Sequence, residues 1–455
     1  MNKSIIGIIS LVGIGHSIAY GQEKPNIVFY IGDDHGLLDA SIYGATDVRT
    51  PQMERISKLG MVFDRAFIAS PASGPSRAAL LTGKMPARNG AEANHTYPKD
   101  EIQVLPRILQ ENGYEVAAFG KVAHGKMNNT SKFDSYSVPE VNLAKNVNAF
   151  LQNRTATKPL CLLVGDRRPH VPWTNELLYK PEDVKLPSYF IDTKQTREHR
   201  SMYYSDITGL DAEMGKVYDM AKERFGDNFI FIYSADHGAQ WPFGKWNLYD
   251  AGIRVPLVMV WPNHIKTNVR TSAMVSWIDV FPTLLDITGS KKPTDLDGKS
   301  FANVLKNNKS KFREYIFTTH SGDGNKNIYP IRSVRTDRYK YIRNLHPEFY
   351  HSNHSDIDRK KNAGAYWNSW DSVAKIDIKA REIISRYYQR PAEEFYDLSN
   401  DPTEQNNLIN KPELAKQIDK MRQLLNKWLV EQGDELKIYN TPYYLYQNRP
   451  TNKIL

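Results

Sequence analysis

The chain has 455 residues, 40% hydrophobic and 24% charged, and these proportions exclude a disordered chain and allow a sizeable core. Lys and Arg number 60 against 51 Asp and Glu. This excess of +9 is spread along the chain, as is typical of a solvated surface, although it would also suit a polyanionic substrate. The single cysteine, Cys161, excludes an intrachain disulfide framework and a zinc site built from cysteines.

The first residues have the pattern of an export signal. Lys3 gives a basic start, residues 5–14 are apolar, and small residues lead up to a cleavage point that we place before Gln22. A membrane anchor is the alternative, but the apolar run is shorter than the roughly 20 residues that a span needs. We therefore predict a signal peptide over residues 1–21 and a mature protein, without a membrane span, that is periplasmic or secreted.

Short apolar runs alternate with helical patterns over the first two thirds of the chain. The runs predict buried strands at residues 26–31, 116–119, 160–164, 229–233 and 255–260. Thr50 caps a helix that starts with Pro51 and ends at Gly60, and residues 105–112 form another that ends at Gly113. This alternation predicts a mostly parallel sheet that helices cover on both faces.

Near residue 310 the pattern changes. Residues 331–343 predict a β-hairpin that turns near Asp337. An apolar stripe at helical spacing, followed by a stop at Gly433, predicts a helix packed on the core; it consists of Leu414, Ile418, Met421, Leu425 and Trp428. We expect a large α/β domain over residues 22–310 and a smaller α+β domain with a short antiparallel sheet over residues 311–455.

Polar side chains follow four of the predicted strands. They are Asp33, Asp34, Lys121, His124, Asp166, Arg168, His170, Asp236 and His237. In open α/β sheets ligands bind outside the carboxyl ends of the strands, so we expect these side chains to converge on one crevice. Any one of them alone is as easily explained as a loop cap or a satisfied core group, but jointly they predict a functional site.

The segment 73–83, SGPSRAALLTG, predicts a short helix in which Pro75 occupies the first turn. Ser73 would lie just before the helix N-terminus, where free N–H groups and the helix dipole favour an anion. Arg77 lies one turn further and can neutralise that anion. We interpret Ser76 as a helix cap and Ser73 as a site residue.

With this motif the sequence resembles the type I sulfatases, in which the first residue of the motif, Cys or Ser, is oxidised after translation to formylglycine. Residues 73–77 and 81–83 carry the signature. Further segments match over nearly the whole mature chain, at residues 25–36, 120–124, 168–170, 234–238, 245–249, 252–256 and 395–408. The resemblance implies an alkaline-phosphatase-like α/β sandwich and the hydrolysis of sulfuric esters.

The resemblance also implies one divalent cation per chain, usually calcium, with magnesium or manganese as alternatives. Its ligands would be Asp33, Asp34, Ser73, Asp236 and His237. Three carboxylates suit a hard cation, whereas a histidine departs from an all-oxygen shell. The cation would polarise a sulfate oxygen and orient the nucleophile.

The other matched residues have implied catalytic roles. Sulfate would be bound by Arg77, Lys121 and Lys245, which would stabilise the negative charge of the transition state. Ser73, converted to formylglycine and hydrated, would attack sulfur, with Asp236 as the proton acceptor. His170 would be the general acid for the leaving atom, and His124 would help to expel sulfate and regenerate the aldehyde.

Two departures from the family pattern have consequences. Residue 73 is Ser rather than Cys, and serine requires a different maturation enzyme from the one that oxidises cysteine in oxygen. A formylglycine-generating maturase that acts on Ser73 is therefore an implied partner. Two residues separate Lys121 from His124, where many members have one, although some carbohydrate sulfatases, including iduronate-type ones, share this spacing.

The substrate prediction is a glycan. Side chains beside the matched segments could bind sugar rings, with core packing as the alternative for each tryptophan; they are Arg167, Trp173, Trp241 and Trp246. The C-terminal third, at residues 329–334 and 395–398, resembles heparan N-sulfatase-like members, a branch that includes bacterial enzymes acting on algal polysaccharides. We predict hydrolysis of sulfate esters on a sulfated polysaccharide or oligosaccharide, such as ulvan, carrageenan or a glycosaminoglycan. The alternative is an N-sulfoglucosamine sulfohydrolase acting on heparan-type glycans.

Two other classes compete with this interpretation. A phosphoesterase of the alkaline phosphatase superfamily would need further Asp and His ligands for a second metal, where this chain has Arg77, Lys121 and Lys245. A non-catalytic protein that binds sulfated glycans would not need the intact motif. We expect a sulfated carbohydrate as substrate and no nucleic acid partner.

Overall fold

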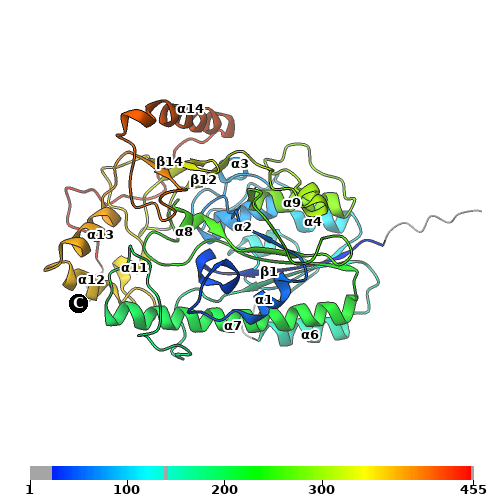
Figure 1. Cartoon of the computed structure of the whole chain (residues 1–455). Helices are drawn as coiled ribbons and strands as arrows, with labels where there is room; N and C mark the ends of the chain where they lie inside the picture. The colour runs from blue at the N-terminus through cyan, green and yellow to red at the C-terminus, as the bar shows by residue number, and fades with distance from the viewer. Residues whose placement is uncertain (1–22, 138–141, 452–455) are drawn as a thin grey trace, which may run out of the picture.

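A computed structural model describes residues 23–137 and 142–451 of the chain. The predicted signal peptide, residues 1–21, lies outside the described residues. Figure 1 shows a central sheet between two layers of helices, with the C-terminal part of the chain gathered at one end. No helix in the described part is long and apolar enough to cross a membrane.

The central sheet has eight strands in the order β10-β2-β9-β7-β1-β6-β4-β5. Their bounds are β1 Asn26–Gly32, β2 Met61–Phe63, β4 Glu115–Gly120, β5 Ser135–Ser137, β6 Leu160–Asp166, β7 Phe229–Ala235, β9 Leu257–Val260 and β10 Val269–Thr271. β1 pairs in parallel with β6 and β7, whereas β9 runs antiparallel to β2 and β7. The prediction of an α/β fold with a large, mostly parallel sheet is confirmed.

The single strand predicted over residues 255–260 is wrong. Pro256 interrupts it, because proline has no N–H to donate to a ladder. The chain instead forms β8 Arg254–Val255, which belongs to a separate three-stranded sheet, and then β9 in the central sheet. The other strands of that small sheet are β3 Ala66–Phe67 and β11 Val275–Ser276.

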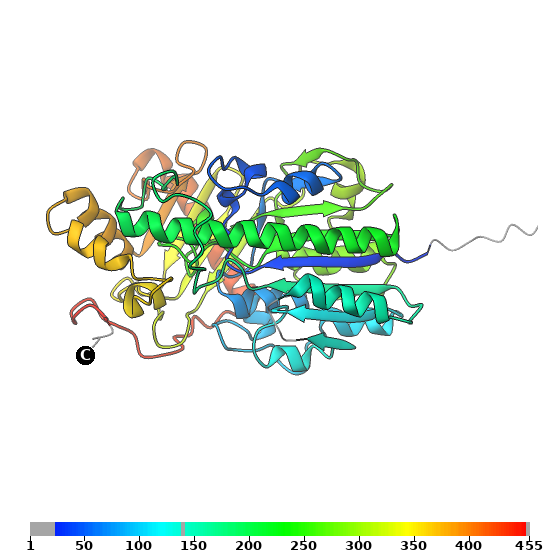
Figure 2. The same cartoon turned by 90° about the horizontal axis from the view of Figure 1, so that it is seen from below.

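Helices cover both faces of the central sheet (Figure 1), and α7 runs along one face (Figure 2). On the α7 side are α1 Pro51–Ser57, α6 Leu143–Asn153 and α7 Lys194–Phe225; on the other are α2 Ser73–Thr82, α4 Leu105–Glu111 and α9 Val280–Ile287. Val28 and Tyr30 of β1 join the core on the α7 side, whereas Ile27, Phe29 and Ile31 join the core on the α2 side. A strand buried on both faces reads as a continuous apolar run, which is the pattern that identified β1 in the sequence.

The start of α1 differs from the prediction in one respect. The side chain of Thr50 does not cap the helix, because its Oγ1 accepts from the backbone N–H of Ser41 at 3.0 Å. The N–H groups of Gln52 and Met53 donate instead to the carboxylate of Asp211, each at 2.8 Å. Asp211 belongs to α7, so this cap is a tertiary contact that the local sequence does not reveal.

The C-terminal part contains a four-stranded antiparallel sheet in the order β12-β13-β14-β15. Its strands are β12 Ile316–His320, β13 Ile331–Arg335, β14 Tyr339–Asn344 and β15 Glu393–Asp397. The predicted hairpin is β13 and β14, and the predicted C-terminal helix is α14 Ala415–Gln432, which ends at Gly433 in the left-handed region and packs on this sheet. The sheet lies within the predicted domain 311–455, although the division into two domains stays a prediction.

The remaining helices are short or lie near the C-terminal sheet. They are α3 Pro86–Asn89, α5 Met127–Thr130, α8 Asp250–Ile253, α10 Ala302–Asn307, α11 His354–Asp358, α12 Trp367–Val373 and α13 Ile378–Tyr388. Single 3-10 turns lie at Leu37–Asp39, Ser41–Tyr43, Trp277–Asp279 and Pro412–Leu414.

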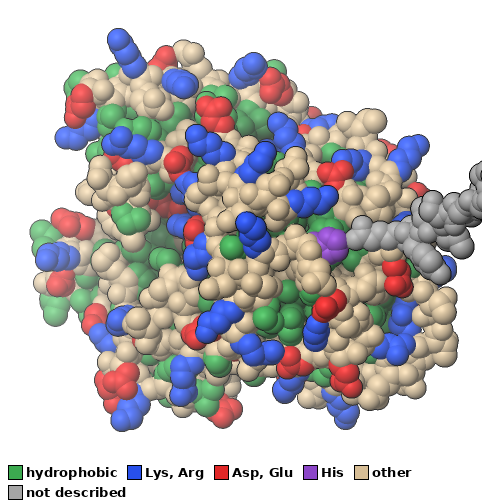
Figure 3. Space-filling model, turned by 45° about the vertical axis from the view of Figure 1, so that its right-hand side comes forward, with side chains coloured by type: hydrophobic (Ala, Val, Ile, Leu, Met, Phe, Trp, Pro, Cys, Tyr) green, Lys and Arg blue, Asp and Glu red, His purple; other side chains and the backbone are tan. Residues whose placement is uncertain are grey.

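On the face shown in Figure 3, Lys and Arg are interspersed with Asp and Glu, as expected for a solvated surface.

His320, at the end of β12, should make stability depend on pH. Its imidazole is fully buried, its Nε2 lies 2.5 Å from Oδ1 of Asn327, and burial lowers its pKa from 6.5 to about 4. As the pH falls, this histidine is therefore protonated in the unfolded chain at a higher pH than in the folded protein. The contribution of the neutral, buried imidazole to the free energy of unfolding is complete above pH 6.5 and is lost as the pH falls through 4. Relative to His320→Gln, the wild-type free energy of unfolding should fall by up to about 3 kcal/mol over this window in urea titrations. If the free energies of unfolding of the wild type and His320→Gln differed by the same amount at pH 7 and pH 4.5, the imidazole of His320 would not be buried in its neutral form.

Candidate active site

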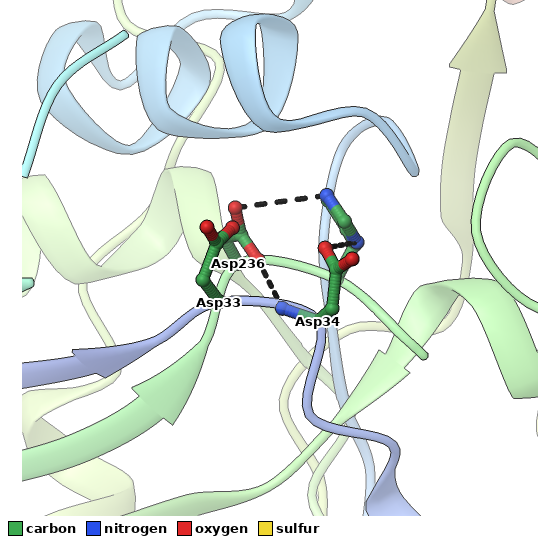
Figure 4. Close-up of side chains that lie close together, drawn as sticks. Asp33, Asp34 and Asp236 are labelled. Atoms are coloured by element: carbon green, nitrogen blue, oxygen red, sulfur yellow. Dashed lines mark hydrogen bonds and ion pairs between the residues drawn. The ribbon is translucent and has the colours of Figure 1, made fainter. Parts of the chain in front are cut away.

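The predicted metal ligands meet at the carboxyl ends of β1 and β7. Asp33 and Asp34 follow β1, and Asp236 and His237 follow β7, its parallel neighbour, with Gly32 paired to Ala235. All four side chains are buried, and each offers a ligand atom within 4.8 Å of the others. Figure 4 shows the three carboxylates facing one another, with the backbone N–H of Asp34 donating to Oδ1 of Asp236 at 3.1 Å. This donor set fits a divalent cation.

Ser73 lies beside this cluster at the N-terminus of α2. Its Oγ is 3.0 Å from Nε2 of His237 and 3.3 Å from Oδ1 of Asp33, and the residue is only 2% exposed. Nδ1 of His237 lies 3.0 Å from the backbone oxygen of Gly238 and must donate its proton there, which leaves Nε2 as an acceptor facing Ser73. Ser73 is the first residue of the helix and not the residue before it, which is Ala72.

The interpretation of Ser76 as a helix cap is wrong. Its hydroxyl donates to the backbone oxygen of Asp236 at 2.5 Å, while its own N–H donates to Ala72 within the helix. This contact joins α2 to the loop after β7 and therefore helps to hold Asp236 opposite Ser73.

Three basic side chains pair with the three carboxylates. Nε of Arg77 donates to Oδ2 of Asp236 at 3.0 Å, and its Nη2 donates to Oδ1 of Asp33 at 3.3 Å. Lys121 donates to Asp33, and Nζ of Lys245 lies 2.9 and 3.0 Å from the two carboxylate oxygens of Asp34. In this buried set the three basic side chains balance the three carboxylates.

These pairs control the charge of the site. Burial alone would raise the pKa of Asp33, but Lys121 and Arg77 hold it well below its ordinary value. Burial alone would lower the pKa of Lys245, but the carboxylates, Asp34 first, raise it. Both groups are therefore ionised near neutral pH, and the favourable pairing offsets the cost of burying them.

The two predicted acid–base histidines are neutral near pH 7. Nδ1 of His170 lies 2.6 Å from the backbone oxygen of Val171 and must donate its proton there, which leaves Nε2 as an acceptor. Burial, with Lys245 and Lys121, keeps the pKa of His170 well below its ordinary value. Burial, with Lys121, lowers the pKa of His124 to about 4.

Asp166 and Arg168 do not join the site, so the expectation that all the polar side chains at the four strand ends converge is wrong for these two. Nη2 of Arg168 donates to Oδ2 of Asp166 at 2.6 Å, and the hydroxyl of Tyr30 donates to the same oxygen at 2.6 Å. Tyr30 belongs to the core on the α7 side, so this pair lies on the opposite face from α2. Side chains alternate between faces along a strand, and the sequence alone did not show on which face Asp166 lies.

The tryptophans proposed to stack on sugars are core residues. Trp173, Trp241 and Trp246 are only 1%, 4% and 3% exposed. Trp173 and Trp241 stack on each other with ring centroids 4.7 Å apart, and Trp246 stacks on His354. Core packing, the alternative, therefore holds for each, and only Arg167 of the proposed sugar contacts is exposed.

The structure also brings polar residues to the site that the sequence did not single out. Oδ1 of Asn94 accepts from the N–H of Gly74, next to Ser73, at 2.9 Å. Nδ1 of His95 lies 3.1 Å from Nε2 of His124, and Asp323 lies on the far side of His95. These residues stand in loops far from any predicted strand end, and only tertiary packing brings them here.

Comparison with known proteins gives consistent results. The family model described as "Sulfatase" matches residues 25–140 and 136–290, and the model described as "N-sulphoglucosamine sulphohydrolase, C-terminal" matches residues 237–381. An ulvan-active sulfatase of Formosa agariphila is 32% identical over 428 residues, which cover 91% of this chain and 82% of that protein. Human N-sulphoglucosamine sulphohydrolase is 26% identical over 478 residues, which cover 91% of each chain.

The fold is similar to that of solved structures. One is a protein in complex with its substrate D-glucosamine-2-N,6-O-disulfate, with a TM-score of 0.69 and 21% identity over 91% of this chain and 99% of that one. At this identity the likeness shows the shared fold alone.

Proposed function

Because the chain belongs to the sulfatase family and is a sulfuric ester hydrolase, we propose that it removes sulfate from a sulfated polysaccharide or oligosaccharide, such as ulvan, carrageenan or a glycosaminoglycan. The observation that carries this proposal is the buried cluster of Asp33, Asp34, Asp236 and His237 beside Ser73, paired with three basic side chains. The similarity to an ulvan-active sulfatase over most of the chain supports an algal glycan.

An N-sulfoglucosamine sulfohydrolase acting on heparan-type glycans is the second candidate. The family model that matches residues 237–381, and the likeness to the human protein of that name, favour it. A phosphoesterase with two metals is disfavoured, because the described residues form one cluster with the geometry of a metal site and its surroundings already hold Arg77, Lys121 and Lys245.

The donor set defines the cofactor that we propose. Asp33, Asp34, Asp236 and His237, with residue 73, would hold one divalent cation, calcium first and magnesium or manganese as alternatives. When bound, the cation would polarise a sulfate oxygen and orient the nucleophile. We also propose that a maturase that acts on serine oxidises Ser73 to formylglycine. The hydrated formylglycine would be the nucleophile.

The basic residues would bind the sulfate group. Arg77, Lys121 and Lys245 would exchange part of their pairing with the carboxylates for contacts to sulfate oxygens, and they would stabilise the charge of the transition state. The carboxylates hold these donors in the site before the substrate arrives. Asp236, held by Arg77 and by Ser76, would accept a proton from the nucleophile.

The two histidines would move protons at opposite ends of the reaction. Lys245 and Lys121 lower the pKa of His170, so an anionic sulfate ester bound between them would offset their charge and raise it again. His170 would then carry a proton on Nε2 when substrate is present and donate it to the leaving atom. His124 would accept a proton when sulfate is expelled.

Metal binding should stabilise the protein. Chelation with EDTA should lower the thermal unfolding midpoint, and calcium in excess should raise it again. A free calcium concentration of 1,000 times the dissociation constant would stabilise the folded protein by about 4 kcal/mol. In Asp236→Asn the midpoint should no longer respond to calcium, because one of the three carboxylates is lost. Equal midpoints in EDTA and calcium would contradict the assignment, and two zinc ions per chain by elemental analysis would favour the phosphoesterase.

The proposed function is tested by sulfate release from heparin-derived, chondroitin, ulvan and carrageenan oligosaccharides. The protein should be produced in a host that matures serine-type sulfatases, and sulfate measured by ion chromatography. Release from an O-sulfated algal substrate would support the first candidate, and release of N-linked sulfate from heparin fragments the second. Absence of release by protein shown by mass to carry formylglycine would refute this choice of substrates.

We further propose that the chain is exported to the periplasm or secreted, and that residues 22–310 and 311–455 form its two domains. Export would place the enzyme where sulfated polysaccharides are met. Sequencing the N-terminus of the exported protein would test cleavage before Gln22.

A further inference from the structure

The segment that carries Lys245 is held by the C-terminal part of the chain. It runs from Phe243 to Asp250, the first residue of α8. Each of residues 246–250 is hydrogen-bonded to a different C-terminal residue, in order Asp323, Arg390, Lys340, Glu394 and Glu404. The position of Lys245 therefore depends on contacts that come from outside the central sheet.

One of these contacts reaches the backbone of Lys245 itself. Nδ2 of Asn247 donates to the backbone oxygen of Lys245 at 2.9 Å, and Oδ1 of Asn247 accepts from Nη2 of Arg390 at 2.6 Å. The amide has only one possible orientation, because a guanidinium can only donate and a backbone carbonyl can only accept. Arg390, Asn247 and Lys245 thus form one directed chain of hydrogen bonds.

Arg390 is a buried cation without a carboxylate partner. It is 5% exposed, and no described residue forms an ion pair with it. Its guanidinium carbon lies 5.3 Å from the ring centroid of Tyr249 and 5.8 Å from that of Tyr329, and its Nε has no hydrogen-bond partner. Burying a guanidinium without an opposite charge is costly, so its role has to be sought in the hydrogen bond that it does make, the one with Asn247.

The backbone is constrained on both sides of Lys245. Its N–H donates to the backbone oxygen of Ala239 at 2.8 Å, and the following residue, Trp246, has φ of +66°, a conformation that a side chain disfavours. The ammonium lies 5.0 Å from the ring centroid of Trp246 and pairs with Asp34. Because a lysine stem is flexible, the fixed backbone and the indole decide where the ammonium stays when a sulfate oxygen replaces part of its pairing with Asp34.

We propose, building on the proposed function, that Asn247 and Arg390 are positioning residues for Lys245. Arg390 orients the amide of Asn247, and the amide holds the carbonyl of Lys245, so that the ammonium stays beside Asp34 when it also binds a sulfate oxygen. Neither residue touches the substrate in this scheme. Their loss is therefore felt through Lys245 and lowers the affinity for the sulfate group.

Asn247→Asp separates the two contacts, because a carboxylate keeps an oxygen for Arg390 but has no N–H for the carbonyl of Lys245. The variant should have a thermal midpoint close to that of the wild type, while KM for a sulfated oligosaccharide and Ki for inorganic sulfate rise by the same factor, about 10- to 100-fold. Asn26→Asp, at the opposite end of β1, removes an amide that donates to the backbone oxygen of Asn228 and should change neither constant. An unchanged Ki in folded Asn247→Asp would overturn the inference.

A double-mutant cycle tests Arg390. Arg390→Met removes the donor and keeps an apolar stem, so KM and Ki should rise as in Asn247→Asp, and Arg390→Lys, which keeps the charge and a donor, should recover part of the loss. In an Asn247→Ala background Arg390→Met should have little further effect, because the amide that it orients is already absent. Full additivity of the two changes would show that the residues act separately and would overturn the inference.

Inorganic sulfate separates this inference from the proposed function. In calcium it should raise the thermal midpoint of protein with unmodified Ser73 more than that of Lys245→Ala, and Asn247→Asp should behave like Lys245→Ala. If this difference is seen but the matured wild type releases no sulfate, the proposed function fails and the inference stands. If the wild type releases sulfate and Asn247→Asp binds it equally well, the inference fails and the function stands. Equal responses of the wild type and Lys245→Ala would overturn the sulfate contact of Lys245 and the inference with it.

Discussion

Ser73→Ala is expected to abolish sulfate release, with a loss of at least about 10⁴-fold in kcat. The hydroxyl of Ser73 is the group that lies between His237 and Asp33, and a methyl group can neither be oxidised nor attack sulfur. Activity is measured as sulfate released by ion chromatography. The matched control is Ser70→Ala, which removes another buried hydroxyl shortly before Ser73, one without a hydrogen-bond partner, and it should stay active.

The maturation of residue 73 can be separated from its position. Ser73→Cys should be active when it is produced in oxygen with a cysteine-type maturase, whereas the wild type should need a serine-type maturase. The mass of the peptide that contains residue 73 reports the oxidation directly, as the loss of two hydrogen atoms from serine. Full activity of a wild-type sample whose residue 73 is unmodified serine would contradict the formylglycine proposal.

The features that the sequence predicts well are those that local rules determine. A strand buried on both faces is a continuous apolar run, and a helix that binds an anion needs a particular first turn, so β1 and α2 were recognisable. The resemblance to the sulfatases added Lys245, which follows no predicted strand, and the structure places it on Asp34. The residues in the site were therefore found by combining strand ends with one long motif.

The features that the sequence did not predict depend on faces and on distant contacts. Asp166 lies at a strand end but faces α7, and the cap of α1 comes from Asp211 in another helix. Trp241 follows a metal-ligand segment in sequence yet packs in the core. His95 meets His124 only because the turn that holds Asp323 packs against the loop after α3.

Arg77→Met should separate the structural role of the positive charge from its role in binding sulfate. The guanidinium is fully buried, pairs with Asp33 and Asp236, and donates to the backbone oxygen of Lys121. Without it two buried carboxylates lose a partner in the interior, so in EDTA the free energy of unfolding should fall by about 3–5 kcal/mol. Denaturation in urea measures this loss, and Arg55→Met, at an exposed pair with Asp219, should cost less than about 1 kcal/mol.

Calcium should then distinguish the two roles. A bound divalent cation supplies charge next to the same carboxylates, so calcium should restore part of the stability of Arg77→Met and bind it at least as tightly as it binds the wild type. It should not restore sulfate release, which we expect to stay reduced by at least about 100-fold, because the cation cannot donate hydrogen bonds to sulfate from the position of the guanidinium. If Arg77→Met were as stable as the wild type in EDTA, Arg77 would not be needed as the buried partner of these carboxylates. If calcium restored its activity, Arg77 would serve only to hold the carboxylates, and sulfate binding would rest on Lys121 and Lys245.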